Sequence, residues 1–526
     1  MNSRSIVSLG LSAINLGSSA SLVGAAALLS ACGAFGPDRS PPAMPSTAHY
    51  SVSGQPTQLP LADGVAQQLM AGARPVPEWW RAYGSPALDA LVAEGLAHSP
   101  SLGASQHTLK SAQEQLRSEI GDSLYPNIDA SFSPSRQRAL GLPILPQQTF
   151  VEDIFSAQLK ASYTFDFFGA SILGDRALEG QVEQQVFQFE ATRRTLAANI
   201  VTGTIRAAAL QAQVDATTTL VALGEQRARQ TASRYQLGGV SQDDVLAAEQ
   251  DAANAAATLP GLRAQLLAVR HAQAVLLGRL PSDAPAPLPL ESLHVPVAVP
   301  VAIPSELLRQ RPDILAAEAA VRAAADNAGA ATASMFPTLK LSASYGRGGF
   351  DWSTFTSPAG MLWGVGASLT QPLFHGGALV ARKRQYQATY EAAISQYKQT
   401  VLAAFQNVAD TLSALDEDAN TVTQTRRAAD AAQRTGANTE ARYKLGAMPF
   451  YATLTAAQQY QSARVQYVRA QAARLTDTAT LFEAMGNPPV AAGAQGLHDE
   501  SLRLGRQAAA SAIPAVAPAS GAVATP

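Results

Sequence analysis

Arg-Tyr-Gln-Leu-Gly at residues 234–238 and Arg-Tyr-Lys-Leu-Gly at residues 442–446 are two nearly identical stretches, about two hundred residues apart. Each one ends a long helical pattern at a glycine, Gly238 or Gly446, and a second helical pattern begins a few residues later. Glycine suits the left-handed conformation that closes a helix. Each stretch therefore predicts the tip of a hairpin of antiparallel helices. One copy alone would fit an ordinary helix–helix turn, but two copies with matching flanks indicate an internal repeat.

Two segments with a period of two precede each long helical pattern. They span about residues 126–136 and 154–167 in the first repeat, and about 337–346 and 361–371 in the second. Large apolar side chains alternate with polar ones, over a length close to the ~10 residues of a transmembrane strand. A soluble hairpin with one buried face has the same alternation, so the pattern alone leaves both possibilities open. If the strands cross a membrane, the polar residues expected to line a wet lumen include Lys160, Asp166 and Lys340.

The helical segments are unusually long. Residues 169–235 contain no proline and predict one helix that could extend on the order of 100 Å. Its partner returns after the tip, and Pro260 is expected to kink or break that second helix. In the second repeat the large apolar residues between Leu379 and Leu415 are spaced mostly by three and four positions. This spacing is typical of coiled-coil packing.

The sequence thus predicts a mainly α protein with a small β part and an internal two-fold repeat. Trp79 and Trp80 stand shortly before the first repeat and are expected to be packing anchors rather than an interfacial belt. The expected division is a signal peptide (1–31), an extended lipidated N-terminal segment (32–86), a first repeat (87–280, tip at 235–244), a connector (281–310), a second repeat (311–487, tip at 443–452) and a disordered tail (488–526).

Cys32 is the only cysteine of the 526-residue chain, and it follows a mostly apolar run that begins after Arg4. The order Leu-Ser-Ala-Cys at residues 29–32 resembles the lipobox of bacterial lipoproteins, in which the cysteine receives lipid and becomes the mature N-terminus. The resemblance also implies sorting to the outer membrane, because glycine rather than aspartate follows the cysteine. A plain signal peptide with an incidental cysteine is the alternative.

The composition argues against several classes of function. The formal net charge of −2 provides no basic surface for nucleic acid. No stretch matches the glycine-rich loop that binds nucleotide phosphates, and the seven histidines are scattered without metal-ligand spacing. No nucleophile and base are arranged for catalysis. We therefore expect a passive protein that is not an enzyme, with no cofactor or metal apart from the covalent lipid on Cys32.

The strands set a condition on assembly. No segment after the signal peptide offers the ~18 uninterrupted apolar residues of a membrane helix, so any crossing is expected to use strands. Each chain supplies four candidate strands, whereas single-chain bacterial barrels begin at about eight. Several chains would then share one barrel, because an open sheet edge in lipid is too costly. Three chains would supply twelve strands and six helical hairpins.

Together these features resemble the TolC-like outer-membrane efflux proteins, and most closely the lipoprotein branch often called the NodT type. The resemblance covers about residues 76–487. It rests on the lipobox, the two Tyr-x-Leu-Gly turns, and the motifs Trp79-Trp80, Pro86-Ala87-Leu88, Arg311-Pro312-Asp313-Ile314 and Gln371-Pro372-Leu373-Phe374. It implies a homotrimer with a twelve-stranded outer-membrane barrel and a periplasmic α-barrel. It also implies two partners, a periplasmic adaptor (membrane fusion) protein and an inner-membrane resistance-nodulation-division transporter.

By the same resemblance, the two tips form the periplasmic entrance, where the pore narrows and meets the adaptor. Tyr235 and Asp244 occupy the family's tyrosine and acidic positions in the first tip, with Asp243 beside them. Three copies would form an acidic ring that favours cations. Tyr443 matches in the second tip, and closure there is expected to depend on packing among Met448, Phe450 and Tyr451. The alternative is that these residues only cap and pack the helix ends.

The function that we expect is the exit duct of a tripartite efflux pump, which passively conducts drugs or other small molecules and is gated at the helical tips. One alternative is the outer-membrane channel of a type I protein secretion system. Another, of a different class, is a structural coiled-coil lipoprotein of the periplasm with soluble hairpins. That last protein would have no pore.

Overall fold

The computed structural model describes residues 35–44, 50, 57–73, 76–140 and 149–486. The expected signal peptide, the lipidated Cys32 and the expected disordered tail lie outside these residues. The chain forms two compact units, each built from three separate segments. The first comprises Met1–Ala43, Lys110–Gln184 and Ala317–Tyr397, and the second comprises Met44–Leu109, Gln185–Ala316 and Lys398–Pro526.

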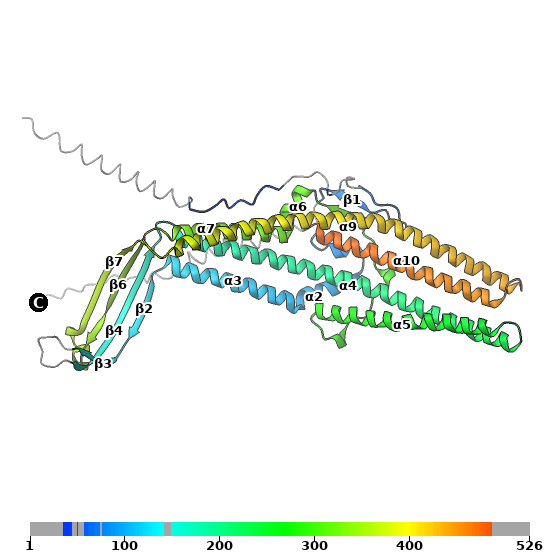
Figure 1. Ribbon diagram of the computed structural model, residues 1–526, viewed down its shortest axis with the longest axis horizontal. Helices are drawn as coiled ribbons and strands as arrows, with labels where there is room; N and C mark the ends of the chain where they lie inside the picture. Colours follow the sequence, from blue (N-terminus) through cyan, green and yellow to red (C-terminus); the bar gives the residue numbers. More distant parts are fainter. Residues whose placement is uncertain (1–34, 45–49, 51–56, 74–75, 141–148, 487–526) are drawn as a thin grey trace, which may run out of the picture. The chain divides into compact units, whose positions relative to one another are not determined.

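The internal repeat is visible in the order and length of the elements (Figure 1). A shorter helix, strands, a helix of 67 residues and a helix of 35 residues follow one another twice. The helices of the first repeat are α3 (Pro100–Leu124), α4 (Ala170–Gln236) and α5 (Gln242–Leu276). Those of the second are α7 (Pro312–Ala333), α9 (Ala378–Lys444) and α10 (Phe450–Ala484). The two-fold repeat predicted from the sequence is therefore confirmed.

The long helices are held by narrow apolar contacts rather than by a wide core. Ala207, Leu210 and Val214 of α4 pack with Leu266 of α5, at the three- and four-residue spacing of one helix face. On α9 the same spacing buries Val401, Val408, Leu412 and Leu415. The predicted break at Pro260 is wrong, because α5 continues through that residue. Pro260 is exposed, so water can satisfy the carbonyl that lacks an N–H partner.

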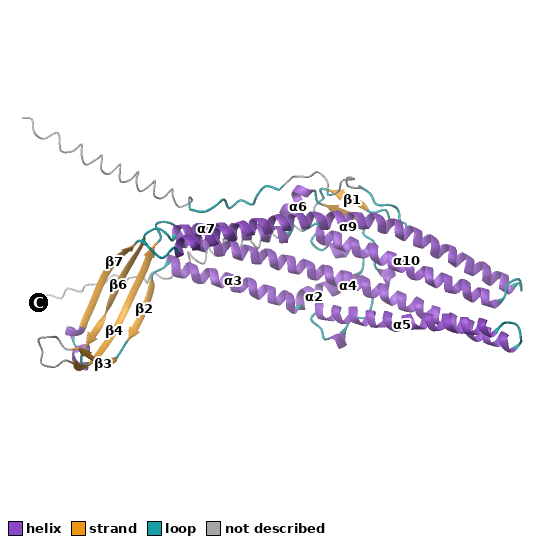
Figure 2. Ribbon diagram, in the orientation of Figure 1, coloured by secondary structure: helices purple, strands orange, loops and turns teal. Residues whose placement is uncertain are grey.

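The strands form one antiparallel sheet in the order β2-β4-β6-β7, drawn in orange in Figure 2. Its members are β2 (Asn127–Phe132), β4 (Thr149–Phe165), β6 (Thr338–Gly349) and β7 (Met361–Thr370). A further strand, β3 (Ser135–Leu140), continues the register of β2 along β4. Pro134 lies between β2 and β3, and proline has no N–H to donate to the ladder. The first expected strand is therefore one edge ribbon in two pieces, and the sheet has four ribbons.

Several smaller elements are not predicted by the sequence pattern. A parallel pair joins β1 (Gln68–Ala71) to β5 (Ala298–Val301), in regions that were expected to be an extended segment and a connector. Ser99 separates α2 (Pro86–His98) from α3. The remaining short elements are η2 (Trp79–Tyr83), η3 (Pro281–Asp283), η4 (Leu290–Ser292), α6 (Pro304–Gln310), α8 (Trp352–Thr356) and η5 (Pro358–Gly360).

The tryptophan pair in η2 is a packing anchor, as predicted. Trp79 is 4% exposed and Trp80 is 7% exposed. The Trp79 ring stacks on Phe482 of α10, with 5.3 Å between ring centroids. Within the described part of the chain, no helix is both long enough and apolar enough to span a membrane.

Both hairpin tips close by the same backbone motif. Gly238 and Gly446 have φ of 71° and 75°. The N–H of Gly238 donates to Tyr235 O at 2.9 Å and that of Gly239 to Arg234 O at 2.8 Å. The second tip repeats this pair of bonds from Gly446 and Ala447. This is the Schellman arrangement, which satisfies carbonyls left free at a helix end.

We predict that Gly238→Ala loosens the first tip, because a non-glycine residue in the left-handed region costs roughly 1–2 kcal/mol. Amide hydrogen exchange of residues 234–244 should become at least about fivefold faster, the equivalent of about 1 kcal/mol. Gly436→Ala is the matched control, because Gly436 lies inside α9 and an added Cβ there meets nothing within 4 Å. That control should slow exchange in α9. Unchanged exchange at the tip in Gly238→Ala would contradict the prediction.

Candidate functional site

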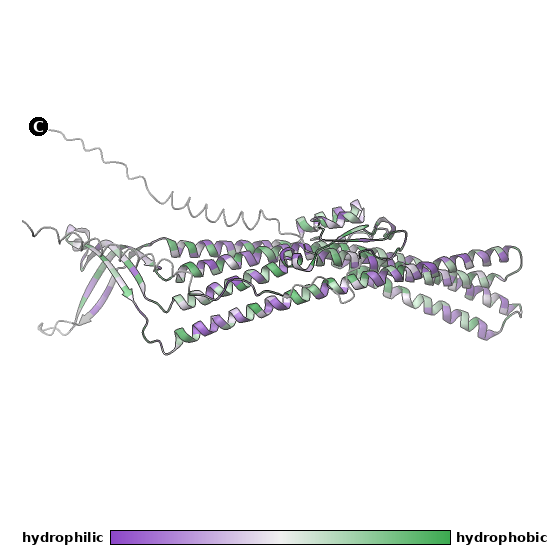
Figure 3. Cartoon of the chain, turned by 90° about the horizontal axis from the view of Figure 1, so that it is seen from above, coloured by the Kyte–Doolittle hydropathy of each residue, from purple (hydrophilic) through white to green (hydrophobic). Residues whose placement is uncertain are grey.

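The sheet has one polar and one apolar face, and the register shows that each is continuous across all four ribbons. In an antiparallel pair, residues directly opposite each other point to the same face. Asp129 lies opposite Lys160, which lies opposite Ser344 on β6, and Ser344 lies opposite Gly364 on β7. The next row runs through Ala130, Leu159, Tyr345 and Trp363. Purple and green therefore alternate along the strands in Figure 3.

Over most of its area, the apolar face has no partner among the described residues. Its exposed side chains include Val365 at 80%, Trp363 at 73%, and Ile128 and Leu369 at 70% each. An apolar surface of this kind marks a contact with another protein or with lipid. On the opposite face the polar side chains are small hydroxyls, amides and a few charges. This arrangement allows one face to meet lipid while the other meets water.

Two of the three expected lumen residues lie on the polar face. Lys160 belongs to β4 and Lys340 to β6. Lys340 lies opposite Thr164, which is two residues from Ser162 along β4 and therefore on the same face. Asp166 was expected on a strand, but β4 ends at Phe165. The Asp166 carboxylate instead accepts hydrogen bonds from the N–H groups of Ala170 at 2.8 Å and Ile172 at 3.0 Å. It satisfies free donors at the start of α4, which is the ordinary role of a capping acid.

The two acidic residues of the first tip differ in their hydrogen bonding. The Asp244 carboxylate accepts from the N–H of Ser241 at 2.9 Å and from its hydroxyl at 2.7 Å, and Ser241 Oγ accepts from the N–H of Asp244 at 3.2 Å. This reciprocal capping box starts α5, and the hydrogen bonds from Ser241 lower the pKa of Asp244. Asp243 is exposed in the same turn. Asp244 therefore caps its helix. For Asp243, the described hydrogen bonds include no capping bond, and its side chain is exposed.

The second tip is aromatic. The rings of Tyr443 and Phe450 lie 5.1 Å apart between centroids, while Met448 is half-buried. Tyr451 is 44% exposed, and the guanidinium carbon of Arg234 lies 5.5 Å above its ring centroid. This cation–π contact joins the end of α4 to the start of α10. Sequence reasoning missed Arg234 as a contact between the tips, although the arginine that begins both repeated stretches was the available signal.

The repeated leucine of each tip points into solvent. Leu237 is 87% exposed and Leu445 is 84% exposed, whereas Tyr235 and Tyr443 are about half as exposed, at 45% and 41%. Two large apolar side chains at matching positions of a repeat therefore have no partner among the described residues.

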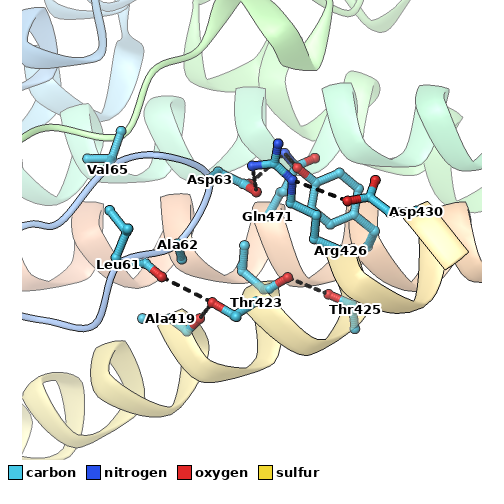
Figure 4. Close-up of polar contacts among 12 residues, drawn as sticks. Leu61, Ala62, Asp63, Val65, Ala419, Thr423, Thr425, Arg426, Asp430 and Gln471 are labelled. Carbon is cyan, nitrogen blue, oxygen red and sulfur yellow. Dashed lines mark hydrogen bonds and ion pairs between the residues drawn. The ribbon is translucent and has the colours of Figure 1, made fainter.

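A turn of the N-terminal segment, Leu61–Gln67, is clamped against α9 and α10 (Figure 4). Asp63 has a positive φ of 52°. Its carboxylate forms an ion pair with Arg426 at 3.1 Å and accepts a hydrogen bond from the Gln471 amide at 3.0 Å. Thr423 donates to Leu61 O at 3.2 Å. A left-handed aspartate costs energy, so these contacts must hold the turn in place.

Arg474 of α10 is the centre of this clamp. Its side chain is 1% exposed, and it donates to Ala62 O, Val65 O and Gln67 Oε1, each at 3.0 Å. A buried cation must have its donors satisfied, and here the N-terminal segment provides the acceptors. Sequence reasoning missed this contact. The signal was an arginine on the same helix face as the buried Ala470, Thr478 and Leu481.

A second acid lies close to the clamp. Burial, followed by repulsion from Asp477 and a hydrogen bond that protonated Asp418 donates to Asp477, raises the pKa of Asp418 to about 7. One oxygen of Asp418 is buried and has no donor when both carboxyls are ionised. A proton on Asp418 resolves this, because the acid can then donate to Asp477. The described residues contain no group of three or more His, Cys, Asp or Glu side chains that could hold a metal ion.

Comparison with known proteins agrees with this geometry. The profile of the outer membrane efflux protein family matches residues 91–279 and 303–487, one match for each repeat. The pyoverdine export outer membrane protein OpmQ of Pseudomonas aeruginosa is 29% identical over 476 residues, which are 89% of this chain and 96% of OpmQ. Nodulation protein T of Rhizobium leguminosarum bv. viciae is 28% identical, over 84% of this chain and 88% of its own.

The fold comparison leads to the same class. The Campylobacter jejuni CmeC outer membrane channel superposes with a TM-score of 0.76 at 20% identity, over 88% of this chain and 98% of CmeC. A duplicated strand-and-hairpin unit with a two-faced sheet defines a TolC-like channel protein. The chain belongs to the outer membrane efflux protein family. It is an outer-membrane protein whose helical part lies in the periplasm, and the resemblance inferred from its motifs is confirmed.

We predict that the Asp418 carboxyl makes stability fall as pH rises. Its pKa in the folded protein, about 7, is above the ~3.9 of an unfolded aspartate, so the folded state binds more protons between these values. The stabilisation is complete below about pH 4 and is lost as pH rises through about 7. In detergent-purified Asp418→Asn, the apparent melting temperature should fall less between pH 5 and pH 8 than in the wild type.

The amide introduced by Asp418→Asn could still donate a hydrogen bond to Asp477, so the variant removes the titration and keeps the contact. Asp416→Asn, on the same helix, is the matched control and should preserve the wild-type pH dependence. Equal pH dependence in Asp418→Asn and the wild type would show that Asp418 does not titrate in this range.

Proposed function

We propose that the protein is the exit duct of a tripartite efflux pump, and that it passively conducts small molecules across the outer membrane. The observation that carries the proposal is the sheet, which has an unbroken polar face and an apolar face that the described residues leave largely uncovered. In the chain its strands directly precede two 67-residue helices. A wet lumen needs the polar face, and lipid needs the apolar one. Family membership supports the same role. The duct has no catalytic activity, and energy comes from its partners.

Closure of the duct requires neighbouring copies. β2 and β7 are the two edge ribbons, and within the part of the chain that the structure describes each has a ladder partner on one side only. Successive ribbons are antiparallel, so in a sheet of four the two edges run in opposite directions. The β7 edge of one copy can therefore join the β2 edge of the next in another antiparallel ladder. Three copies would close a barrel of twelve ribbons, as in the homotrimer that the family resemblance implies.

A lipid on Cys32 fits the placement of the first described residues. The Phe35 ring packs against Phe168, which follows β4, and Phe336, which precedes β6, at centroid distances of 6.3 and 4.9 Å. Nearby, Arg39 pairs with the buried Asp326 at 3.1 Å. Three residues reach at most about 11 Å, so an acylated Cys32 would be attached close to the strand ends. We propose that the lipid and the sheet enter the same membrane.

The tips are proposed as the entrance gate and the adaptor contact. Leu237 and Leu445 provide exposed apolar anchors, while Asp243 and Asp244 would form an acidic ring in three copies. The cation–π contact from Arg234 to Tyr451 would hold the two tips together in the closed state. An adaptor that binds the leucines and separates this contact would open the entrance, and an inner-membrane resistance-nodulation-division transporter would supply the cargo.

Light scattering on the detergent-purified mature protein tests the assembly. We expect a protein mass of three chains after the detergent contribution is subtracted. Leu159→Arg should reduce the yield of that assembly, because arginine at a lipid-facing site near the midplane costs ~2–4 kcal/mol. Lys160→Arg, on the opposite face, should not. A monomer that is stable on dilution would refute the channel and favour the structural lipoprotein.

A double variant, Leu237→Asp with Leu445→Asp, tests the tips. Burial of one leucine contributes about 1.5–3 kcal/mol, so the loss of both should weaken adaptor binding by at least about a hundredfold. Cells should become as drug-sensitive as a deletion strain while the amount of trimer stays unchanged. Leu280→Asp is the control, because Leu280 is 70% exposed outside both tips. Full resistance in the double variant would refute adaptor docking through the leucines.

A further inference from the structure

The connection between β6 and β7 contains a small ordered element at the end of the sheet remote from α7 and α9. Asp351 caps its helix α8, with hydrogen bonds from the N–H and the hydroxyl of Thr354, both at 2.8 Å. Arg347 of β6 donates to Thr356 O at 2.6 Å. The helix is five residues long, so these side-chain contacts, rather than helix propagation, must fix it.

Contacts of α8 with the sheet show which face it covers. The Trp352 ring packs on Phe155 at 5.6 Å between centroids, and the Phe355 ring lies 6.2 Å from both Phe155 and Phe132. Phe132 lies opposite Ala157, which is on the same face as Phe155 and Leu159. This is the apolar face. The element therefore folds over the outside of the sheet and leaves the polar face uncovered by α8.

Two glycines make this close approach possible. Gly349 lies opposite Phe155, and a Cβ built on it would lie 2.6 Å from the backbone nitrogen of Phe355. A Cβ on Gly360 would lie 2.5 Å from Thr354 O. Contacts this short do not occur with real side chains, so α8 can lie on the sheet only because both positions lack a Cβ.

Large rings on this element remain exposed although the element is fixed. Trp352 is 58% exposed and the adjoining Phe350 is 67% exposed. The hydroxyls of Thr354 and Thr356 are satisfied locally by Asp351 and by Trp352 O. An ordered segment with satisfied polar groups and projecting rings suits the boundary between headgroups and acyl chains, where Trp is favoured.

We propose that α8, with Phe350, is a lipid-contacting element that anchors the far rim of the sheet in the headgroup layer, and is not a lid over the pore. The proposal rests on the proposed function, in which the apolar face meets lipid. A neighbouring copy is a poorer occupant, because copies would join at β2 and β7, whereas Trp352 packs on the interior ribbon β4.

Spin labelling in lipid vesicles tests the proposal with three single-cysteine sites. Trp352→Cys reports on α8, Leu159→Cys on the apolar face and Ser342→Cys on the polar face. Signal from Cys32 is measured in the unsubstituted protein and subtracted. We expect sites 352 and 159 to collide mainly with dissolved oxygen, with 352 at the shallower depth, and site 342 to collide mainly with a water-soluble nickel chelate.

The outcomes separate the two proposals. If site 159 is in lipid but site 352 is reached by nickel as readily as site 342, α8 is not a lipid anchor and the duct remains. If sites 159 and 342 are equally open to nickel, the sheet is not in a membrane and both proposals fail. Adding Gly349→Val should displace α8 and shift site 352 towards nickel while site 159 stays unchanged. Gly364→Ala is the mild control, since its nearest neighbour would be Ser344 Oγ at 3.4 Å.

Discussion

The free hydrogen-bonding edges of β2 and β7 are the constraint on which the rest of the structure depends. Each unpaired N–H or C=O in hydrocarbon costs several kcal/mol, so a four-ribbon sheet with an uncovered apolar face cannot stand alone in a membrane. A sheet with an even number of ribbons can join to copies of itself without a parallel mismatch. The starting points of α4 and α9 depend on this sheet, because the two helices begin shortly after β4 and β7.

Much of this architecture could be predicted, because it depends on local sequence patterns. Gly238 and Gly446 locate the tips because a left-handed turn is a local requirement, and strand alternation assigns Lys160 and Lys340 to one face. The clamp around Arg474 could not be predicted, since it joins Gln67 to a helix more than four hundred residues later. The β1–β5 pair is missed for the same reason. Asp166 is a different error, because the alternation continues past the end of β4 into a residue that caps α4.

The two tips share a backbone motif and differ in chemistry. The first begins its second helix with a capping box between Ser241 and Asp244, whereas the second begins with Pro449 at the cap position and no side-chain cap bond. Aromatic packing by Tyr443 and Phe450 occupies the second tip instead. Duplication has therefore kept what the turn requires of the backbone, and the side chains have diverged. The divergence lies in the helices that follow the tips, because the Arg-Tyr-x-Leu-Gly stretch before them is the same in both copies and leaves its leucine exposed.

The matching helix lengths of the two repeats also constrain how the chain can change. Both repeats have 67 residues before the tip and 35 after it, and Arg234 reaches Tyr451 only while the tips end at the same level. An insertion in α4 alone would shift α4 relative to α5, its partner in the hairpin. Equal insertions in α4 and α5 would still carry Arg234 past the Tyr451 ring. A change of length that keeps this contact therefore needs matching insertions in all four helices, which links the reach of one hairpin to that of the other.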